Sequence, residues 1–231
     1  EIAQCLVGSE MCIRDRDNYR ELLDLDDKYS GYQKVAANVI AMDGTNWFSS
    51  FTIDKGSKEG IKKGMNVIAG SGLVGIVTDV GPNFAKVRSI IDDSSNVSSM
   101  VLTTKDNFNV GGSLKSMNQD KVLPFTELRD EDDKVKVGDP VVTSYVSDQY
   151  QEGILIGYIA SIEKNANNLT KSGTITPVVD FQHLREVLVI TTLKDTGEKE
   201  LSSQKASDTQ TETQDNTCLL YTSPSPRDTE R

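Results

Sequence analysis

Cysteine, histidine and long apolar runs are scarce in this 231-residue chain. Its three cysteines, Cys5, Cys12 and Cys218, lie near the two ends, so residues 17–217 contain none. A segment without cysteine cannot hold a disulfide, a thiolate metal site or a cysteine nucleophile. No apolar stretch approaches the roughly 20 residues that cross a bilayer as a helix. From the residues present, we therefore expect neither thiol chemistry nor a membrane-spanning helix.

Positive charge is also in short supply. The chain has 35 acidic and 25 basic side chains, and its formal net charge is −10. Binding to nucleic acid depends on a clustered excess of Lys and Arg that contacts phosphates. The acidic balance therefore argues against a nucleic-acid partner. A hydrophobic content of 36% and a charged content of 26% are typical of a folded globular chain.

The single histidine, His183, limits the catalytic sites that the sequence can build. One histidine without cysteine cannot form the usual zinc site, and no EF-hand loop is present. Ser71 lies between glycines and would be the nucleophile of a Ser-His-Asp triad. However, His183 lies between the expected core residues Phe181 and Leu184, and we interpret it as a solvated turn residue. We predict no catalytic residue, no metal and no cofactor.

The two ends of the chain read as translated adapter DNA. The sequence CLVGSEMCIRD at 5–15 can be encoded by a DNA whose opposite strand, in a shifted frame, encodes CLLYTSPSPRD at 218–228. Two unrelated natural termini would match in this way only by coincidence over eleven codons. We therefore interpret residues 1–16 and 218–231 as sequencing-adapter artefacts and exclude them from the fold.

Two segments next to these ends differ in residue pattern from the middle of the chain. Residues 17–33 have a helical pattern, and Leu22, Leu25, Tyr29 and Tyr32 follow the spacing of a coiled-coil seam. We predict the end of a coiled coil here, and the alternative is a short helix that caps a domain. Residues 194–217 have no aromatic and almost no aliphatic side chain, so we predict a disordered polar tail.

Between these segments the pattern is β throughout. Short clusters of Val, Ile, Thr and aromatic residues are separated by Gly, Asn and Asp, which is typical of strands and turns. No amphipathic helix of useful length interrupts them, so parallel βαβ folds are excluded and an all-β barrel or sandwich is expected. The predicted strands are 34–42, 47–54, 66–70, 72–80, 84–91, 96–104, 108–114, 121–126, 140–144, 153–164, 173–180 and 186–193.

A faint internal repeat favours two similar small barrels. Residues 60–80 contain a turn at Gly64, a short strand and a second strand with Gly72 and Gly75. Residues 134–144 repeat the first half with Gly138, and residues 152–162 repeat the second half with Gly153 and Gly157. Glycine before a strand supplies a turn, and glycine within a strand permits a sharp barrel corner. We expect a first barrel at 34–105 and a second at 106–193, with the last strands free to cross back.

The only tryptophan, Trp47, is the most informative aromatic residue. It lies beside Phe48 and the alternating Phe51 and Ile53, a pattern that favours a barrel-core anchor. The alternative is a partly exposed aromatic residue that anchors an interface.

Longer stretches of the chain resemble the extracytoplasmic part of the MreC family of bacterial rod shape-determining proteins. The resemblance covers roughly 37–190 in consistent order, and the chain differs from the family pattern at Gly44 and in the loop 145–151. The matching stretches are 37–92, KVGDPVVTS at 136–144, EGILIGYIASIEK at 152–164 and TPVVDFQHLREVLVI at 176–190. The family-like positions are Asn46, Trp47, Asp54, Gly56, Gly64, Gly72, Gly75, Gly138, Gly153, Gly157, Asp180 and Phe181.

The resemblance implies a fold and a role. The fold would be a chymotrypsin-like pair of β-barrels without a triad, and the matching glycines and aromatics would be structural. The role would be a non-catalytic scaffold of the cell-wall elongation complex, needed for rod shape and peptidoglycan synthesis. A single-pass membrane helix and a dimeric coiled coil would lie upstream, with this region on the extracytoplasmic side. The partners would be a second copy of the chain, MreD and a class B penicillin-binding protein.

Two other kinds of function stay open from the sequence. One is an inactive, protease-like barrel module that binds peptide or cell-wall glycan. The other is a true hydrolase. Binding of isolated muropeptides would favour the first, and reaction with serine-directed probes would favour the second.

Overall fold

A computed structural model describes residues 28–42, 49–70, 72–130, 134–165 and 169–194. These residues form twelve strands, one α-helix and one 3-10 helix, which is the all-β fold predicted from the sequence. The predicted adapter segments 1–16 and 218–231, most of the predicted helix 17–33 and all but the first residue of the predicted tail 194–217 lie outside the described residues. The strands are β1 (Lys34–Met42), β2 (Ser50–Ile53), β3 (Asn66–Ala69), β4 (Gly72–Val80), β5 (Ala85–Ser89), β6 (Asn96–Val101), β7 (Asn107–Gly111), β8 (Leu123–Leu128), β9 (Pro140–Thr143), β10 (Leu155–Lys164), β11 (Lys171–Pro177) and β12 (Glu186–Ile190).

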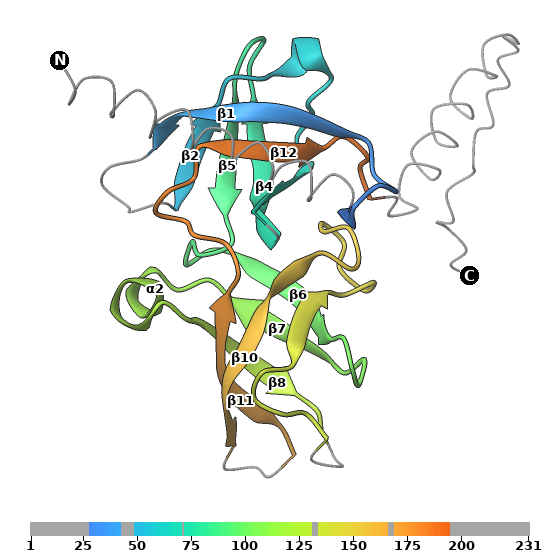
Figure 1. Ribbon diagram of the computed structural model, residues 1–231, viewed down its shortest axis with the longest axis vertical. Coiled ribbons are helices and arrows are strands. Elements are labelled where there is room, and N and C mark those ends of the chain that lie inside the picture. The colour runs from blue at the N-terminus through green and yellow to red at the C-terminus, as the bar shows by residue number, and fades with distance from the viewer. Residues whose placement is uncertain (1–27, 43–48, 71, 131–133, 166–168, 195–231) are drawn as a thin grey trace, which may run out of the picture. The chain divides into compact units, whose positions relative to one another are not determined.

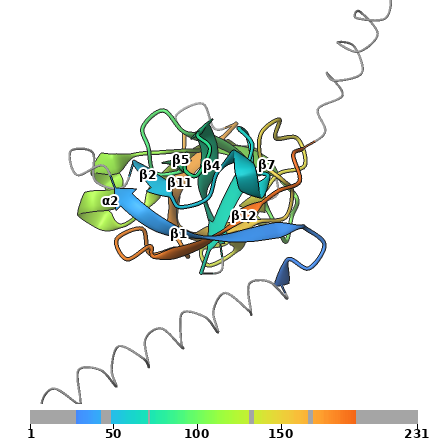
Figure 2. The same ribbon diagram turned by 90° about the horizontal axis from the view of Figure 1, so that it is seen from above.

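The strands close into two antiparallel barrels of six strands each. The first has the order β1-β12-β3-β4-β5-β2, and the second has the order β10-β11-β8-β7-β6-β9. In Figure 1 the labelled strands of the two barrels form two separate groups. Strands β1 and β12 run side by side (Figures 1 and 2). Lys34 pairs with Ile190 at one end of their ladder. The prediction of two small barrels is confirmed.

The division of the chain between the barrels differs from the expected one. β6 lies before the expected boundary at 105/106, yet it pairs with β7 and β9 in the second barrel. β12 lies after that boundary and pairs with β1 and β3 in the first, which is the crossing back that the expectation allowed for the last strands. The reason is closure: five consecutive strands form an open sheet, and β12 returns to pair its two edges. Two linkers, at 90–95 and 178–185, therefore connect the barrels.

The two copies of the internal repeat make the same backbone hydrogen bond at their first turn. The Gly64 N–H donates to the Val77 carbonyl over 2.9 Å, and the Gly138 N–H donates to the Ile159 carbonyl over 2.8 Å. Both glycines have a positive φ, 90° and 95°, which is a conformation that side chains with a Cβ rarely adopt. The turn before β3 and the turn before β9 are therefore equivalent.

The repeat continues through the strands that follow. Val67 pairs with Gly75 in the first barrel, and Val141 pairs with Gly157 in the second. An ideal Cβ on Gly75 would lie 2.0 Å from the Arg88 carbonyl oxygen, and one on Gly157 would lie 2.2 Å from the Thr176 oxygen. Register shifts lie next to both glycines, so each glycine allows a neighbouring strand to approach where the barrel wall bends.

The repeat extends beyond the stretch that the sequence suggested. After β5 the Asp92 carboxylate accepts the Ser94 N–H over 2.9 Å, and after β11 the Asp180 carboxylate accepts the Gln182 N–H over 3.0 Å. The Ile90 N–H likewise donates to the Val74 carbonyl of β4, and the Val178 N–H donates to the Ile156 carbonyl of β10. Strands β3–β5 with their exit turn are therefore equivalent to β9–β11 with theirs.

One element was not predicted. The helix α2 (Leu114–Asp120) lies between β7 and β8, in a part of the sequence without a helical pattern. The Ser113 hydroxyl caps its first turn by accepting the Ser116 N–H over 3.3 Å. Seven residues make two turns, which is too short for the 3.6-residue period to stand out.

Candidate interaction surface

His183 does not belong to a catalytic triad among the described residues. Its Nδ1 lies 2.6 Å from Asp180 Oδ2, and the two side chains are 78% and 64% exposed. This geometry matches the interpretation of His183 as a solvated turn residue. Burial by itself would raise the Asp180 pKa, but hydrogen bonds from His183 and from the Gln182 N–H outweigh it and lower the pKa. Ser71 lies outside the described residues.

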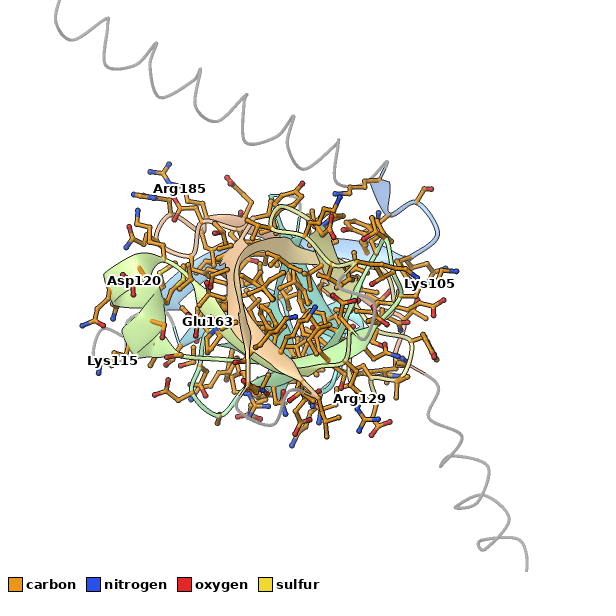
Figure 3. The ribbon with its side chains drawn as sticks, turned by 90° about the horizontal axis from the view of Figure 1, so that it is seen from below. Lys105, Lys115, Asp120, Arg129, Glu163 and Arg185 are labelled. Carbon is orange, nitrogen blue, oxygen red and sulfur yellow. The ribbon has the colours of Figure 1, made fainter. Side chains whose placement is uncertain are left out.

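Metal ligands do not gather in the part of the chain that the structure describes. No group of three or more His, Cys, Asp or Glu residues is placed to hold a metal ion there. The acidic and basic side chains instead lie mostly on the outside. Figure 3 shows Lys105, Lys115, Arg129 and Arg185 at the periphery.

Asp54 and Gly56 hold the end of β2 in the first barrel. Asp54 Oδ1 accepts the Asn38 backbone N–H over 2.8 Å, and Oδ2 accepts Asn38 Nδ2 over 2.9 Å. Partial burial by itself would raise the Asp54 pKa. The two bonds from Asn38 and the charge of Lys55 outweigh this effect, so the pKa lies below its ordinary value. A Cβ on Gly56 would lie 2.4 Å from the Gly81 carbonyl oxygen, so this position admits no side chain.

The other family-like residues lie at turns and where the barrels meet. Gly153 has a φ of 75° in the turn before β10, and Phe181 is 1% exposed in the linker that leads to β12. Gly72 lies where the barrels meet, because a Cβ there would be 2.8 Å from the Leu155 carbonyl oxygen of β10. Asn46 and Trp47 lie outside the described residues.

A row of apolar side chains, three of them exposed, runs over β9 and β10 and the end of β6 in the second barrel. Tyr158 of β10 is the register partner of Pro140 of β9. The Leu102 N–H, just after β6, donates to the Pro140 carbonyl over 3.0 Å. Tyr158 is 47% exposed and Leu102 is 52% exposed. Val137, in the turn before β9, is 63% exposed. We call these four residues the apolar row.

A polar groove lies on the outer face of β6, β7 and β8. It is a cavity of about 700 Å³. Asn107 and Asn109 contribute from β7, and the Ser144 hydroxyl donates to Asn107 Oδ1 over 2.6 Å. Lys105 and Glu127, which also line it, have φ values of 62° and 63°, conformations that are uncommon outside glycine. The groove is rich in hydrogen-bonding groups and has charges of both signs.

The connection between β9 and β10 packs on the first barrel. We call residues 149–155 the docking loop. Asn66 of β3 is 1% exposed, and its Oδ1 accepts the Gln151 N–H over 2.7 Å. Asn66 Nδ2 donates to the Gln149 carbonyl over 3.0 Å. Gln151 Nε2 donates in turn to the Thr192 carbonyl, beyond β12, over 2.9 Å. One buried asparagine therefore satisfies the backbone of a loop from the other barrel.

Two tyrosines before β1 contact the same loop. The Leu155 N–H donates to the Tyr29 hydroxyl over 3.0 Å, and the Tyr32 hydroxyl donates to the Glu152 carbonyl over 3.1 Å. Tyr29 is 8% exposed and belongs to the hydrophobic core. Their spacing predicted the end of a coiled coil, with a short helix that caps a domain as the alternative, but in the structure both tyrosines pack within the chain. Leu22 and Leu25 lie outside the described residues.

Known proteins with similar sequences and similar barrel folds belong to one family. A family model described as rod shape-determining protein MreC, barrel core, matches residues 39–191. The chain belongs to the MreC family. The cell shape-determining protein MreC of Listeria monocytogenes is 33% identical over 194 residues, which cover 82% of this chain and 64% of that relative. A solved structure of MreC from Listeria monocytogenes has a TM-score of 0.63 and 30% identity, and covers 84% of this chain and 95% of that one.

A further solved structure of MreC includes a partner. It is a complex between penicillin-binding protein PBP2 and MreC from Helicobacter pylori. Its TM-score is 0.52 at 13% identity, over 69% of this chain and 99% of that one, which shows a shared fold. This MreC-family chain spans a little under two thirds of the length of its Listeria relative, 64%. Among its described residues, no helix has the length and apolar content needed to cross a bilayer.

Proposed function

We propose that this chain is the extracytoplasmic part of a membrane-anchored scaffold in the cell-wall elongation complex, and that it maintains rod shape without catalysing a reaction. The observation that carries the proposal is the apolar row on the second barrel. Leu102 and Tyr158 expose about half of their surface on the two sides of β9, which is the kind of patch that marks a protein interface. Exposed aromatic residues are frequent anchors of such interfaces.

The proposed partner of the apolar row is a class B penicillin-binding protein. The Helicobacter pylori complex supports this choice, since there an MreC chain of the same fold is bound to PBP2. The proposal also includes MreD and a second copy of the chain, joined through a coiled coil upstream of residue 28. A dimeric scaffold would raise the effective concentration of its partners at the membrane without any new contact.

Binding of the soluble region of the host's class B penicillin-binding protein tests this proposal. Leu102→Asp and Tyr158→Ser should each weaken binding in calorimetry at least tenfold, because each places a polar group or a gap in an apolar contact. Ile40→Ser is the matched control, since Ile40 is 59% exposed but lies on β1 of the first barrel. Equal affinity of all three variants and the parent chain would contradict docking at the apolar row.

The polar groove favours a second candidate function, the binding of a peptide or cell-wall glycan. Its amide and hydroxyl side chains can both donate and accept hydrogen bonds, and its volume is within the usual range for ligand sites. Titration with soluble muropeptides should then shift the NMR side-chain amide signals of Asn107 and Asn109. Unchanged signals at millimolar muropeptide would leave the scaffold as the better account.

A further inference from the structure

The docking loop has its anchors on three segments that are distant in sequence. Asn66 of β3 holds its middle, Thr192 holds the side chain of Gln151, and Tyr29 and Tyr32 hold its second half. All three anchoring segments flank or belong to the first barrel. The loop itself connects two strands of the second barrel. It is thus a point where the position of one barrel depends on the other.

The hydrogen bond from the Leu155 N–H to the Tyr29 hydroxyl would be the hardest of these anchors to replace, because it is buried. Leu155 is the first residue of β10, and both it and Tyr29 are nearly inaccessible to water. If the Tyr29 hydroxyl moved away, the Leu155 N–H would be left buried without an acceptor, which is costly. An ideal Cβ on Gly72 would lie 2.8 Å from the Leu155 carbonyl oxygen, so the start of β10 packs closely on the start of β4. Release of Tyr29 therefore requires the start of β10 to move until the Leu155 N–H finds another acceptor.

The docking loop is also tied to the strands that carry the apolar row. The Thr143 hydroxyl, at the end of β9, donates to the Gln151 carbonyl over 2.5 Å and accepts the Ile154 N–H over 2.9 Å. Pro140 begins β9, and Tyr158 lies three residues after Leu155 on β10. Movement of the loop would thus be transmitted to both strands of the row.

From these contacts we infer that Tyr29 and Tyr32 form a latch that couples the segment preceding β1 to the apolar row. The part of the inference that concerns partner binding rests on the proposed function. A latch that favours one position of β9 and β10 changes the affinity of the row for its partner. Binding at the row then changes the stability of the latch by the same free energy, because coupling between two sites is reciprocal. The packing of the residues just before β1 would thereby alter how strongly the apolar row binds its partner.

Amide hydrogen exchange of the whole chain tests the latch without any partner. Tyr29→Phe keeps the ring in the core and removes only the hydroxyl. It should speed exchange at Leu155 and its loop neighbours at least tenfold and leave β3 and β12 within twofold of the parent. Tyr145→Phe is the control, since Tyr145 is 59% exposed, and it should change nothing in the loop. Tyr32→Phe should produce a smaller increase, centred on Glu152 and Gly153.

Two results would overturn the latch. One is exchange at Leu155 that stays within twofold of the parent in Tyr29→Phe. The other is an equal increase throughout both barrels, which would mean that Tyr29 acts only through general core stability.

The coupling to the row has its own readout. Tyr29→Phe should change the affinity for the class B penicillin-binding protein at least threefold, and saturation with that partner should alter Leu155 exchange in the parent chain. An unchanged affinity beside a loosened loop would overturn the coupling. A parent chain that does not bind the partner would contradict the proposed function and the coupling together, while the exchange data alone would still decide whether the latch exists.

Discussion

Lys171 Nζ lies 2.7 Å from Asp130 Oδ2 in the second barrel, and the two side chains are only 9% and 3% exposed. Asp130 also accepts the N–H groups of Lys134 and Val135, over 3.0 and 3.1 Å. Burial of the carboxylate raises the Asp130 pKa, but the Lys171 ammonium and these N–H donors lower it more, so the pKa lies below its ordinary value. The ion pair therefore joins β11 to the segment after β8 as a charged, hydrogen-bonded unit.

Removing one partner of this pair should destabilise the chain strongly. Lys171→Met leaves the Asp130 carboxylate buried without its counter-ion, which typically costs about 3–5 kcal/mol. The double variant Asp130→Leu with Lys171→Met removes both charges and should recover much of that loss. Urea unfolding of the two variants at pH 7 measures the difference. A single variant as stable as the parent would mean that the pair contributes little.

The same pair has a predictable pH dependence. A carboxyl group whose native pKa is lowered stabilises the fold above its unfolded pKa, near 3.8, and the stabilisation is lost as the pH falls through the native pKa. The parent chain should therefore lose free energy of unfolding below about pH 4. The double variant should lose less over that range, and identical acid profiles would contradict the assignment to Asp130.

The repeated glycines give a third prediction. A Cβ at Gly75 or Gly157 would overlap a backbone oxygen of the neighbouring strand, and backbone cannot move aside as a flexible side chain can. Gly75→Ala and Gly157→Ala should each lower the free energy of unfolding by about 2–3 kcal/mol. Gly111→Ala is the matched strand control, because nothing lies within 4 Å of a Cβ there, and it should stay within about 1 kcal/mol of the parent. Thermal or urea melts that do not separate these variants would contradict the corner assignment.

The sequence supports the local features of this fold better than the distant ones. Val67–Ile68 and Val141–Val142, each preceded by a glycine turn, can be recognised from a few residues, and so can the strands on either side. Closure of the first barrel by β12 depends on pairs such as Lys34 with Ile190, whose members are far apart in the chain. No local pattern encodes such a pairing.

The candidate surfaces depend on distant contacts to an even greater degree. Asn66 is a plain strand residue in the sequence, and only the fold places it against Gln149 and Gln151. The spacing of Tyr29 and Tyr32 suggested a coiled-coil seam, since periodicity reveals that a face is apolar but does not reveal what covers it. Leu102, Pro140 and Tyr158 form a row only because three strands pair in one register.

A buried tyrosine predicts how the chain responds to alkaline pH. Tyr150 is 2% exposed, and burial raises its pKa to about 12 although the charge of Arg88 partly opposes the shift. A native pKa above the unfolded value of 10.0 gives stability that is present below pH 10 and is lost as the pH rises toward 12. The loss should be on the order of 2–3 kcal/mol. Urea unfolding between pH 9 and about 11.5 should show a shallower decline in Tyr150→Phe than in Tyr145→Phe, and equal slopes would count against this assignment.

The last prediction separates assembly from catalysis in cells. A full-length copy of the gene should restore rod shape to cells that are depleted of their own MreC-family protein when it carries His183→Ala. His183 is exposed and contacts only Asp180 among the hydrogen bonds of the described residues, so its loss should disturb neither the fold nor a docking surface. The same copy with Leu102→Asp should express at a normal level and yet leave the cells rounded, because the apolar row would no longer hold its partner. Cell width from microscopy and protein level from immunoblots give the comparison. Failure of a stable His183→Ala protein would reopen the hydrolase hypothesis, and full rescue by Leu102→Asp would remove the apolar row from the mechanism.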